Sequence, residues 1–229
     1  MVGLWVALAL VAAATLTYWL FIVTEGTYLG AKVVTLLYDW TASRYDEVKN
    51  LQYVNELRYL GMPLVASLRK LRRPHVLDVA TGTGRVPLLL LGLAEFTGMV
   101  VGVDRSLRMM AQAKAAVVQY GTRVALIHED AEALSFRGEA FDLVTCLEAL
   151  EFMWDPAAVL REMVRVLRPG GVLLVSGRVG RDARFFPGRL CPPGRVVACL
   201  HELGMDAITT ERWQVHYDLI WARKPLGSP

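Results

Sequence analysis

Residues 75–84 read His-Val-Leu-Asp-Val-Ala-Thr-Gly-Thr-Gly, a short apolar run that ends in a glycine-rich turn. The run has the length and composition of a buried β-strand. Gly82 and Gly84 allow a tight turn and a close approach of the backbone to a ligand. The stretch 85–96 that follows predicts a helix, with Pro87 in its first turn. This order places the N-terminus of a helix, which favours polar or anionic groups, beside the turn.

The same alternation of strand-like and helix-like patterns continues along the chain. Predicted strands cover residues 75–80, 99–104, 123–128, 141–147, 171–177, 207–213 and 216–223. Predicted helices cover residues 106–120, 155–167 and 196–203, and before the first strand 43–60 and 63–71. Strands that alternate with helices predict a parallel sheet covered on both faces. The last two strands leave no room for a crossover helix, so we expect an antiparallel hairpin there.

Acidic residues follow the second and third predicted strands. Asp104 ends the second strand, where a carboxylate can accept both hydroxyls of a ribose. It is equally placed to act as a charge at the start of the next helix, which Ser106 can cap. The acidic stretch 129–132 follows the third strand, and a carboxylate there can accept an adenine amino group. Pro87 occupies the third position of the dinucleotide fingerprint, which argues against NAD.

With these motifs, and with Phe-Asp-Leu-Val at 141–144 and Leu-Arg-Pro-Gly-Gly at 167–171, the chain resembles the class I S-adenosylmethionine-dependent methyltransferases. It is most similar to the broad group that contains quinone-biosynthesis C-methyltransferases and bacterial phospholipid N-methyltransferases. The resemblance covers about residues 38–223. It implies a Rossmann-like α/β fold, with a seven-stranded sheet of order 3-2-1-4-5-7-6 in which strand 7 is antiparallel. It also implies S-adenosylmethionine as the cofactor.

The resemblance further implies which residues bind that cofactor. The first strand and its turn hold the methionine part, Asp104 holds the ribose, and Leu147 lies by the methyl donor. Tyr45 closes over the cofactor, and Ala80 stands where the family usually has glycine. The implied residues are Tyr45, Asp78, Ala80, Gly82, Gly84, Asp104, Arg105 and Met109 beside the adenosine, Asp130 and Ala131 at the adenine, and Leu147.

The sequence does not identify a catalytic residue. Many relatives read Leu-Glu-His after the fourth strand, where this chain reads Leu150-Glu151-Phe152. Methyl transfer is a displacement at a sulfonium, so positioning supplies much of the catalysis. A base is needed only where a proton must leave the acceptor. Glu151 is a candidate base, Glu148 is an alternative, and a structural role for Glu151 is the competing interpretation. No spacing of His, Cys and carboxylates predicts a metal site.

Residues 1–24 contain no charged side chain, and their length matches the roughly 20 residues that cross a bilayer. A signal peptide would have basic residues before its apolar stretch, and none precedes this one. We therefore expect a transmembrane anchor. Lys32, Arg44 and Lys49 follow it, so the positive-inside rule places the rest of the chain on the cytoplasmic side.

These patterns divide the chain into an anchor at 1–24, an interfacial helical segment at 25–73 and a methyltransferase domain at 74–229. Within the second segment, residues 26–40 either lie on the membrane surface or continue the anchor helix. The loop 178–194 carries four arginines around Phe185 and Phe186. We expect it either to contact lipid headgroups or to be a surface loop with two core phenylalanines.

Composition narrows the function. Hydrophobic residues make up 54% and charged residues 21%, which excludes disorder as the main state. The net charge of +3 is too small to indicate nucleic-acid binding, and three cysteines do not make a disulfide framework. The sequence predicts a single-pass membrane methyltransferase acting on a lipophilic or lipid-like acceptor, such as a phospholipid amine, quinone or thiol. The alternatives are an inactive methyltransferase-fold subunit of a membrane complex and a soluble enzyme with a cleaved leader.

Overall fold

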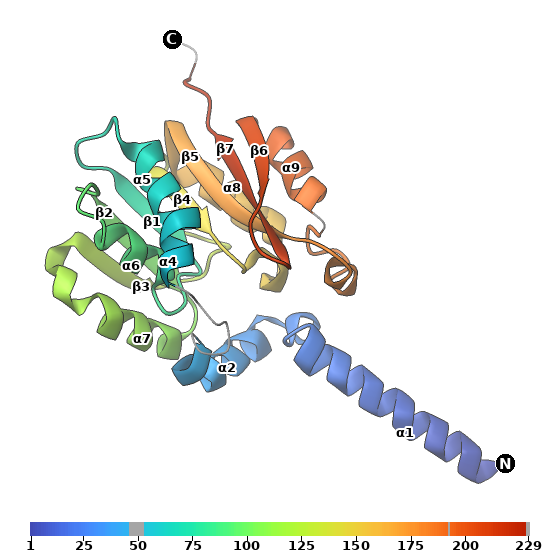
Figure 1. Cartoon of the computed structure of the whole chain (residues 1–229). Helices are drawn as coiled ribbons and strands as arrows, with labels where there is room; N and C mark the ends of the chain where they lie inside the picture. The colour runs from blue at the N-terminus through green and yellow to red at the C-terminus, as the bar shows by residue number, and fades with distance from the viewer. Residues whose placement is uncertain (46–52, 192, 228–229) are drawn as a thin grey trace.

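The computed structural model of the chain describes residues 1–45, 53–191 and 193–227, and its centre is one seven-stranded sheet (Figure 1). The strand order is β3-β2-β1-β4-β5-β7-β6, with β1 to β5 parallel and β7 antiparallel to both neighbours. This confirms the predicted fold class, strand order and terminal hairpin. The strands are β1 (His75–Val79), β2 (Met99–Asp104), β3 (Val124–His128), β4 (Phe141–Cys146), β5 (Leu167–Arg178), β6 (Asp206–Arg212) and β7 (Tyr217–Arg223).

Helices lie between the strands and before β1. They are α1 (Val2–Tyr18), α2 (Ala31–Thr41), α4 (Tyr53–Glu56), α5 (Met62–Leu68), α6 (Arg85–Leu91), α7 (Leu107–Val117), α8 (Pro156–Val166) and α9 (Pro193–Glu202). Shorter helical turns are η1 (Trp19–Val23), η2 (Thr27–Leu29), η3 (Ala42–Arg44), η4 (Leu57–Gly61), η5 (Val118–Arg123), η6 (Leu150–Phe152) and η7 (Asp182–Phe185).

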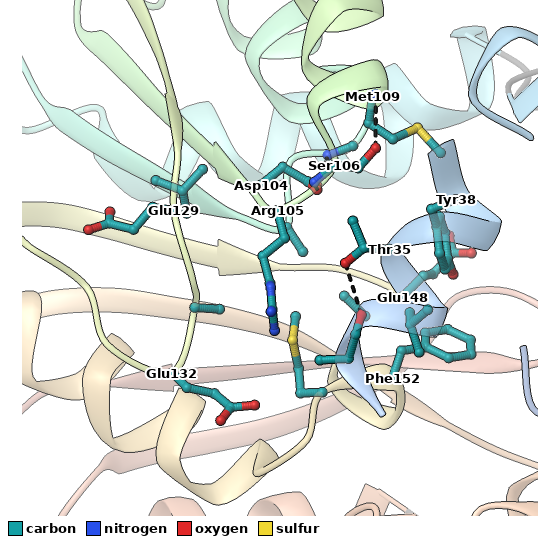
Figure 2. A pocket seen from close by; sticks show the side chains of 18 of the residues that line it. Thr35, Tyr38, Asp104, Arg105, Ser106, Met109, Glu129, Glu132, Glu148 and Phe152 are labelled. Atoms are coloured by element: carbon teal, nitrogen blue, oxygen red, sulfur yellow. Dashed lines mark hydrogen bonds between the residues drawn. The ribbon is translucent and has the colours of Figure 1, made fainter. Parts of the chain in front are cut away.

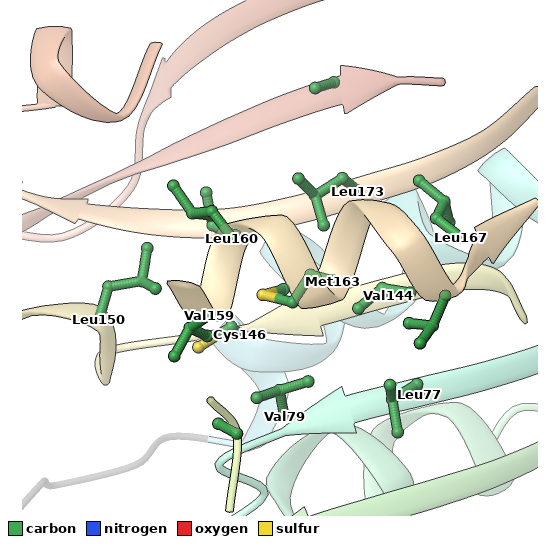
Figure 3. Packing of buried hydrophobic residues seen from close by; sticks show 14 of the residues in the cluster. Leu77, Val79, Val144, Cys146, Leu150, Val159, Leu160, Met163, Leu167 and Leu173 are labelled. Carbon is green, nitrogen blue, oxygen red and sulfur yellow. The ribbon is translucent and has the colours of Figure 1, made fainter. Parts of the chain in front are cut away.

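The hydrophobic core has two layers, because successive residues of a strand point to opposite faces of the sheet. Leu77, Val144 and Leu173 pack on one face against α8 and α9, as Figure 3 shows for α8. Val76 and Leu143 pack on the other face against η4, α5 and α6. The predicted interfacial segment therefore contributes to the core through its last helices.

Helix boundaries differ from the predictions at several places. The helix predicted over 85–96 stops at Leu91, where Gly92 ends it. The helix predicted to residue 167 stops at Val166, because Leu167 already pairs with Phe141 in the sheet. Of the helix predicted over 43–60, residues 46–52 lie outside the described residues.

The N-terminal helix projects away from the sheet, while α2 turns back beneath it (Figure 1). Residues Val2–Val23 form a continuous helix of 22 residues with a mean hydropathy of 2.2, and none of it is buried. It is long and apolar enough to cross a bilayer, and a signal sequence would have the same properties. Left-handed backbone at Glu25 and Gly26 (φ 48° and 74°) ends this helix. Residues 26–40 therefore do not continue the anchor helix, which was one of the two arrangements expected.

Candidate active site

A cleft lies between α2 and the carboxyl ends of β1, β2 and β4 (Figure 2). It encloses about 800 Å³ of empty space, part of it open to solvent. Eight of the residues predicted to bind the cofactor line it: Tyr45, Ala80, Gly82, Asp104, Arg105, Met109, Ala131 and Leu147.

The turn after β1 shapes one end of the cleft. Gly82 has φ 56°, and a Cβ added there would meet no atom within 4 Å, so its backbone faces open space. Gly84 has φ 88°, and its Cβ would lie 3.1 Å from the Cβ of Ala113 on α7. Gly84 is not among the lining residues, so its place in the structure is close helix packing beside the site.

Ala80 has φ 55°, the left-handed conformation that favours glycine. This conformation costs a non-glycine residue about 1–2 kcal/mol, and the extra flexibility of glycine costs roughly 0.5–1 kcal/mol. We expect Ala80→Gly to raise the free energy of unfolding by about 0.5–1 kcal/mol, measured by denaturant titration. The control is Ala115→Gly at an exposed position of α7, which should lower it by about 1 kcal/mol. A loss of stability in Ala80→Gly would contradict strain at this position.

Asp104 is held by backbone groups on both sides. Its Oδ2 accepts a hydrogen bond from Gly82 N–H at 2.8 Å, and its Oδ1 accepts one from Ser106 N–H at 2.8 Å. Burial raises the pKa of Asp104, and these backbone donors oppose the rise. An ionised carboxylate has further lone pairs on each oxygen. The fixed carboxylate is thus oriented to accept two more donors, such as the hydroxyls of a ribose.

Asp78 lies deeper, at a small cavity that adjoins the cleft and shares Tyr45 with it. Its two carboxylate oxygens accept hydrogen bonds from Thr81 Oγ1 at 2.7 Å and Thr145 Oγ1 at 2.6 Å. Burial raises the pKa of Asp78 from 3.8 to about 6, although both hydroxyls oppose the rise. With its oxygens engaged in this way, Asp78 holds the turn in place from below.

The raised pKa of Asp78 predicts a pH-dependent stability. The folded state keeps the proton up to about pH 6, whereas the unfolded state releases it near pH 4. The contribution is therefore present below pH 4 and is lost as pH rises through 6, amounting to roughly 3 kcal/mol. Asp78→Asn removes this dependence and keeps hydrogen-bonding capacity, because threonine hydroxyls can donate or accept.

Denaturant titrations of both proteins without ligand, from pH 4 to 8, test this expectation. The free energy of unfolding of Asp78→Asn should gain on wild type as pH rises from 4 to 7. Parallel curves for the two proteins would contradict a raised pKa.

Of the two residues predicted to meet the adenine, Ala131 lines the cleft and Asp130 does not. Asp130, predicted to meet the adenine, does not line the cleft; its Oδ2 pairs with Arg105 Nη1 at 3.3 Å. Glu129 does line it, and its Oε1 accepts Ser135 N–H at 2.6 Å. The other oxygen of Glu129 is buried without a hydrogen-bond partner among the described residues. An amino group in the cleft would satisfy this oxygen.

The two candidate bases are also separated. Glu148 lines the cleft and its Oε1 accepts from Arg85 Nη1 at 2.8 Å, with left-handed backbone (φ 53°) at this position. Glu151 is 1% exposed and does not line the cleft. Its Oε1 accepts from Arg178 Nη1 at 3.0 Å and from the hydroxyl of Tyr217. Burial raises the pKa of Glu151, against the effect of both partners. This arrangement supports the structural interpretation of Glu151 over the catalytic one.

Helix α2 forms the roof of the cleft, which the sequence did not indicate. Ala31, Val34, Thr35 and Tyr38 line the cleft from this helix, and Figure 2 shows Thr35 and Tyr38 beside it. Their i, i+3, i+4, i+7 spacing places them on one face of the helix, but the spacing does not say what that face contacts. Phe152, which stands where many relatives have histidine, packs edge-on against the Tyr38 ring with 6.0 Å between centroids.

The loop after β5 is partly turned inward. Phe186 is fully buried against Phe152, whereas Phe185 is 44% exposed. Arg189 is buried and donates to the carbonyl oxygen of Met153 at 2.6 Å. Arg178, which pairs with Glu151, is half-buried. Of the two arrangements expected for this loop, Phe186 fits the one with core phenylalanines, whereas the exposed Phe185 does not.

The cleft matches the parts of S-adenosylmethionine. Asp104 suits the ribose hydroxyls, the unpartnered oxygen of Glu129 suits the adenine amino group, and the open space at Gly82 admits a ligand next to the backbone. Met109 and Leu147 supply apolar walls. Among residues 1–45, 53–191 and 193–227, no group of three His, Cys, Asp or Glu is placed to hold a metal ion.

Comparison with known proteins agrees with this geometry. Residues 77–175 match the family model described as a methyltransferase domain. The chain matches this domain over 99 of its 229 residues. It is 34% identical over 140 residues to the demethylmenaquinone methyltransferase of Lactiplantibacillus plantarum, covering 60% of this chain and 59% of that protein. It is 32% identical over 146 residues to a ubiquinone biosynthesis O-methyltransferase of Coxiella burnetii, covering 64% and 59%.

The chain therefore spans about three fifths of the length of these curated relatives. A solved structure, the SAM-dependent methyltransferase of Aquifex aeolicus, superposes with a TM-score of 0.59 and 18% identity, covering 81% of this chain and 97% of that one. It shares the fold. The match to a methyltransferase domain and the fit of the cleft to its parts both support S-adenosylmethionine as the cofactor.

Proposed function

We propose that this protein is a membrane-anchored methyltransferase that transfers the methyl group of S-adenosylmethionine to a small lipophilic or lipid-like acceptor. The observation that carries the proposal is the short connection between the apolar N-terminal helix and the helix that covers the cleft. The exposed apolar helix Val2–Val23 leads within a few residues into α2, which roofs the cofactor cleft. The site is thereby tethered beside the bilayer, where lipophilic acceptors are concentrated. The quinone-pathway names of the two curated relatives support an acceptor of this kind.

The residues of the chain divide the work of such a transfer. When bound, S-adenosylmethionine supplies an activated methyl group on a sulfonium. Asp104 and Glu129 would orient its adenosine part, and the apolar side chains of Tyr38 and Phe152 would exclude water and hold an apolar acceptor. Where the acceptor carries a proton that must leave, Glu148 is the one of the two candidate bases that lines the cleft.

A direct test uses the full chain in lipid nanodiscs with methyl-labelled cofactor and a total lipid extract. We expect the label in the organic phase, attached to a phospholipid amine, a quinone or a lipophilic thiol. Label found only in soluble protein or RNA would contradict the proposal. Protease protection in sealed vesicles checks the proposed cytoplasmic side, which rests on Lys32, Arg44 and Lys49 following the apolar helix.

A second candidate function is a subunit of a membrane complex that keeps the fold without the activity. It is favoured by Phe152, since this position lacks the imidazole of many relatives. Calorimetric titration with S-adenosylhomocysteine separates the two functions. Binding at micromolar concentration supports the enzyme, and no binding at millimolar concentration supports the inactive subunit.

A further inference from the structure

Helix α2 has two different faces. Ala31, Val34 and Tyr38 point into the cleft. Leu36 and Trp40 lie on the opposite side of the helix and are 67% and 77% exposed. A large apolar side chain that is three quarters exposed has a poor environment in water. The outer face of α2 is therefore a surface in need of an apolar partner.

The outer face has the make-up of a helix at a membrane surface. Lys32, Leu36 and Trp40 are four residues apart, so they form one stripe along the helix. Leu29, 40% exposed, precedes the stripe. Tryptophan favours the boundary between hydrocarbon and water, and a lysine stem can cover apolar surface while its ammonium reaches the headgroups.

The chain between α1 and α2 is fixed against the domain. A Cβ at Gly26 would lie 2.9 Å from Val33 Cγ1, so the turn and α2 pack closely. Arg189 donates to the carbonyl oxygen of Thr27 at 3.2 Å and lies over the ring of Tyr28, 5.3 Å from its centroid. With α1 in a bilayer, this connection holds α2 at the membrane surface.

We propose that the outer face of α2, formed by Lys32, Leu36 and Trp40, lies in the bilayer interface together with Leu29 just before it, and that this contact strengthens cofactor binding by holding α2 over the cleft. The inference rests on the proposed membrane anchoring. A protein partner is a poorer match, because a stable interface buries about 800 Å² on each side, and these four residues include three apolar side chains. A bilayer imposes no such minimum.

The coupling follows from how α2 is held. An isolated helix of its 11 residues is marginal in water. Among the described residues, Asp39 accepts hydrogen bonds from the hydroxyl of Ser106 and from Arg108 N–H, its carbonyl oxygen accepts one from the Arg108 side chain, and Tyr38 packs on Phe152. When a ligand binds between α2 and the sheet, part of its binding free energy is lost in ordering α2. Lipid contact on the outer face removes part of that cost.

The first test locates Trp40. The full chain is reconstituted in phosphatidylcholine vesicles that carry a doxyl quencher near the headgroup, and Trp40→Phe is compared with Trp213→Phe as the matched control. We expect Trp40→Phe, and not Trp213→Phe, to lose a strongly quenched component of the fluorescence. If the chain stays on the vesicles and Trp40 is unquenched, the inference fails while anchoring stands. If the chain leaves the vesicles, the proposed anchoring fails as well.

The second test measures the coupling. Leu36→Gln/Trp40→Gln is compared in nanodiscs with Val118→Gln/Leu226→Gln, which changes two apolar side chains that are 69% and 79% exposed elsewhere. We expect the Kd for S-adenosylhomocysteine to rise about five-fold in the α2 variant and to stay within about two-fold of wild type in the control. Equal Kd values for wild type and the α2 variant would overturn the coupling. A concentration-dependent dimer lost in the α2 variant would assign the face to a second copy instead.

Discussion

Replacing Asp104 by asparagine is expected to weaken binding of S-adenosylhomocysteine by about 100-fold. Asparagine keeps the size of the side chain, but it has one acceptor oxygen where Gly82 N–H and Ser106 N–H each need one. Its amide group would face a backbone donor, and the charge that strengthens hydrogen bonds to ligand hydroxyls is lost. Hydrogen bonds to a charged group contribute about 1.5–3 kcal/mol each, so the loss of one or two gives this order of effect.

Isothermal titration of the full chain in nanodiscs measures this change. Asp142→Asn is the control, because Asp142 also accepts a backbone N–H, from His75, and pairs with Arg168 at 2.6 Å, but lies away from the cleft. We expect Asp142→Asn to lose stability and keep its affinity for S-adenosylhomocysteine. Similar affinities for the Asp104 variant and wild type would mean that the ligand lies elsewhere in the cleft.

The fold could be predicted from the sequence because strands covered on both faces leave an unambiguous signal. Runs such as Val100–Val103 and Val172–Val175 are apolar on successive residues, which a half-exposed strand or a surface helix would not be. The terminal hairpin could be predicted because the connection between β6 and β7 is too short for a crossover. Predicted helix boundaries were wrong where strand pairing competed with helix propensity, as at Leu167, which pairs with Phe141 in the sheet.

The site could be predicted only where a residue's place follows from the end of a strand. Asp104 ends β2 and must therefore reach the same edge of the sheet as the turn after β1. The choice between Glu129 and Asp130 depends on how the loop turns after β3, and neighbouring residues there point in different directions. The separation of Glu148 from Glu151 depends on left-handed backbone at Glu148, which its residue type does not indicate.

The roof of the cleft could not be assigned from the sequence for a different reason. The stretch that contains α2 is apolar on two faces, and apolar residues at an interface with lipid and at an interface with protein have the same side chains. Only the turn at Gly26 decides between them, because it brings Tyr38 back to Phe152. The contact partner of a helix is a property of the whole fold.

Replacing Glu151 by alanine is expected to lower the free energy of unfolding by about 3–5 kcal/mol. Glu151 and Arg178 form a buried pair at 3.0 Å, with side-chain exposures of 2% and 14%. Removing the carboxylate leaves the guanidinium of Arg178 without its counter-charge, with only the hydroxyl oxygen of Tyr217 as an acceptor, and leaves the Tyr217 hydroxyl without an acceptor. This is the costly way to break such a pair. For a domain of this size the midpoint of thermal unfolding should fall on the order of 10 °C.

Three further variants separate a structural role from a catalytic one. Glu139→Ala removes an exposed pair with Lys224 at 3.7 Å and should change stability by less than about 1 kcal/mol. Glu151→Leu combined with Arg178→Met removes both charges and should recover much of the lost stability, because no unpaired charge remains. Glu151→Gln keeps an acceptor for Tyr217 and should lie between wild type and alanine.

The decisive comparison is between stability and turnover at a temperature where every variant is folded. Because Glu151 does not line the cleft, Glu151→Gln should keep its affinity for S-adenosylhomocysteine and its kcat within a few-fold of wild type while its unfolding midpoint falls. A base would show the reverse: an unchanged midpoint with a large loss of kcat that depends on pH. The same loss of kcat in Glu148→Gln, with little change in its unfolding midpoint, would assign the proton transfer to Glu148.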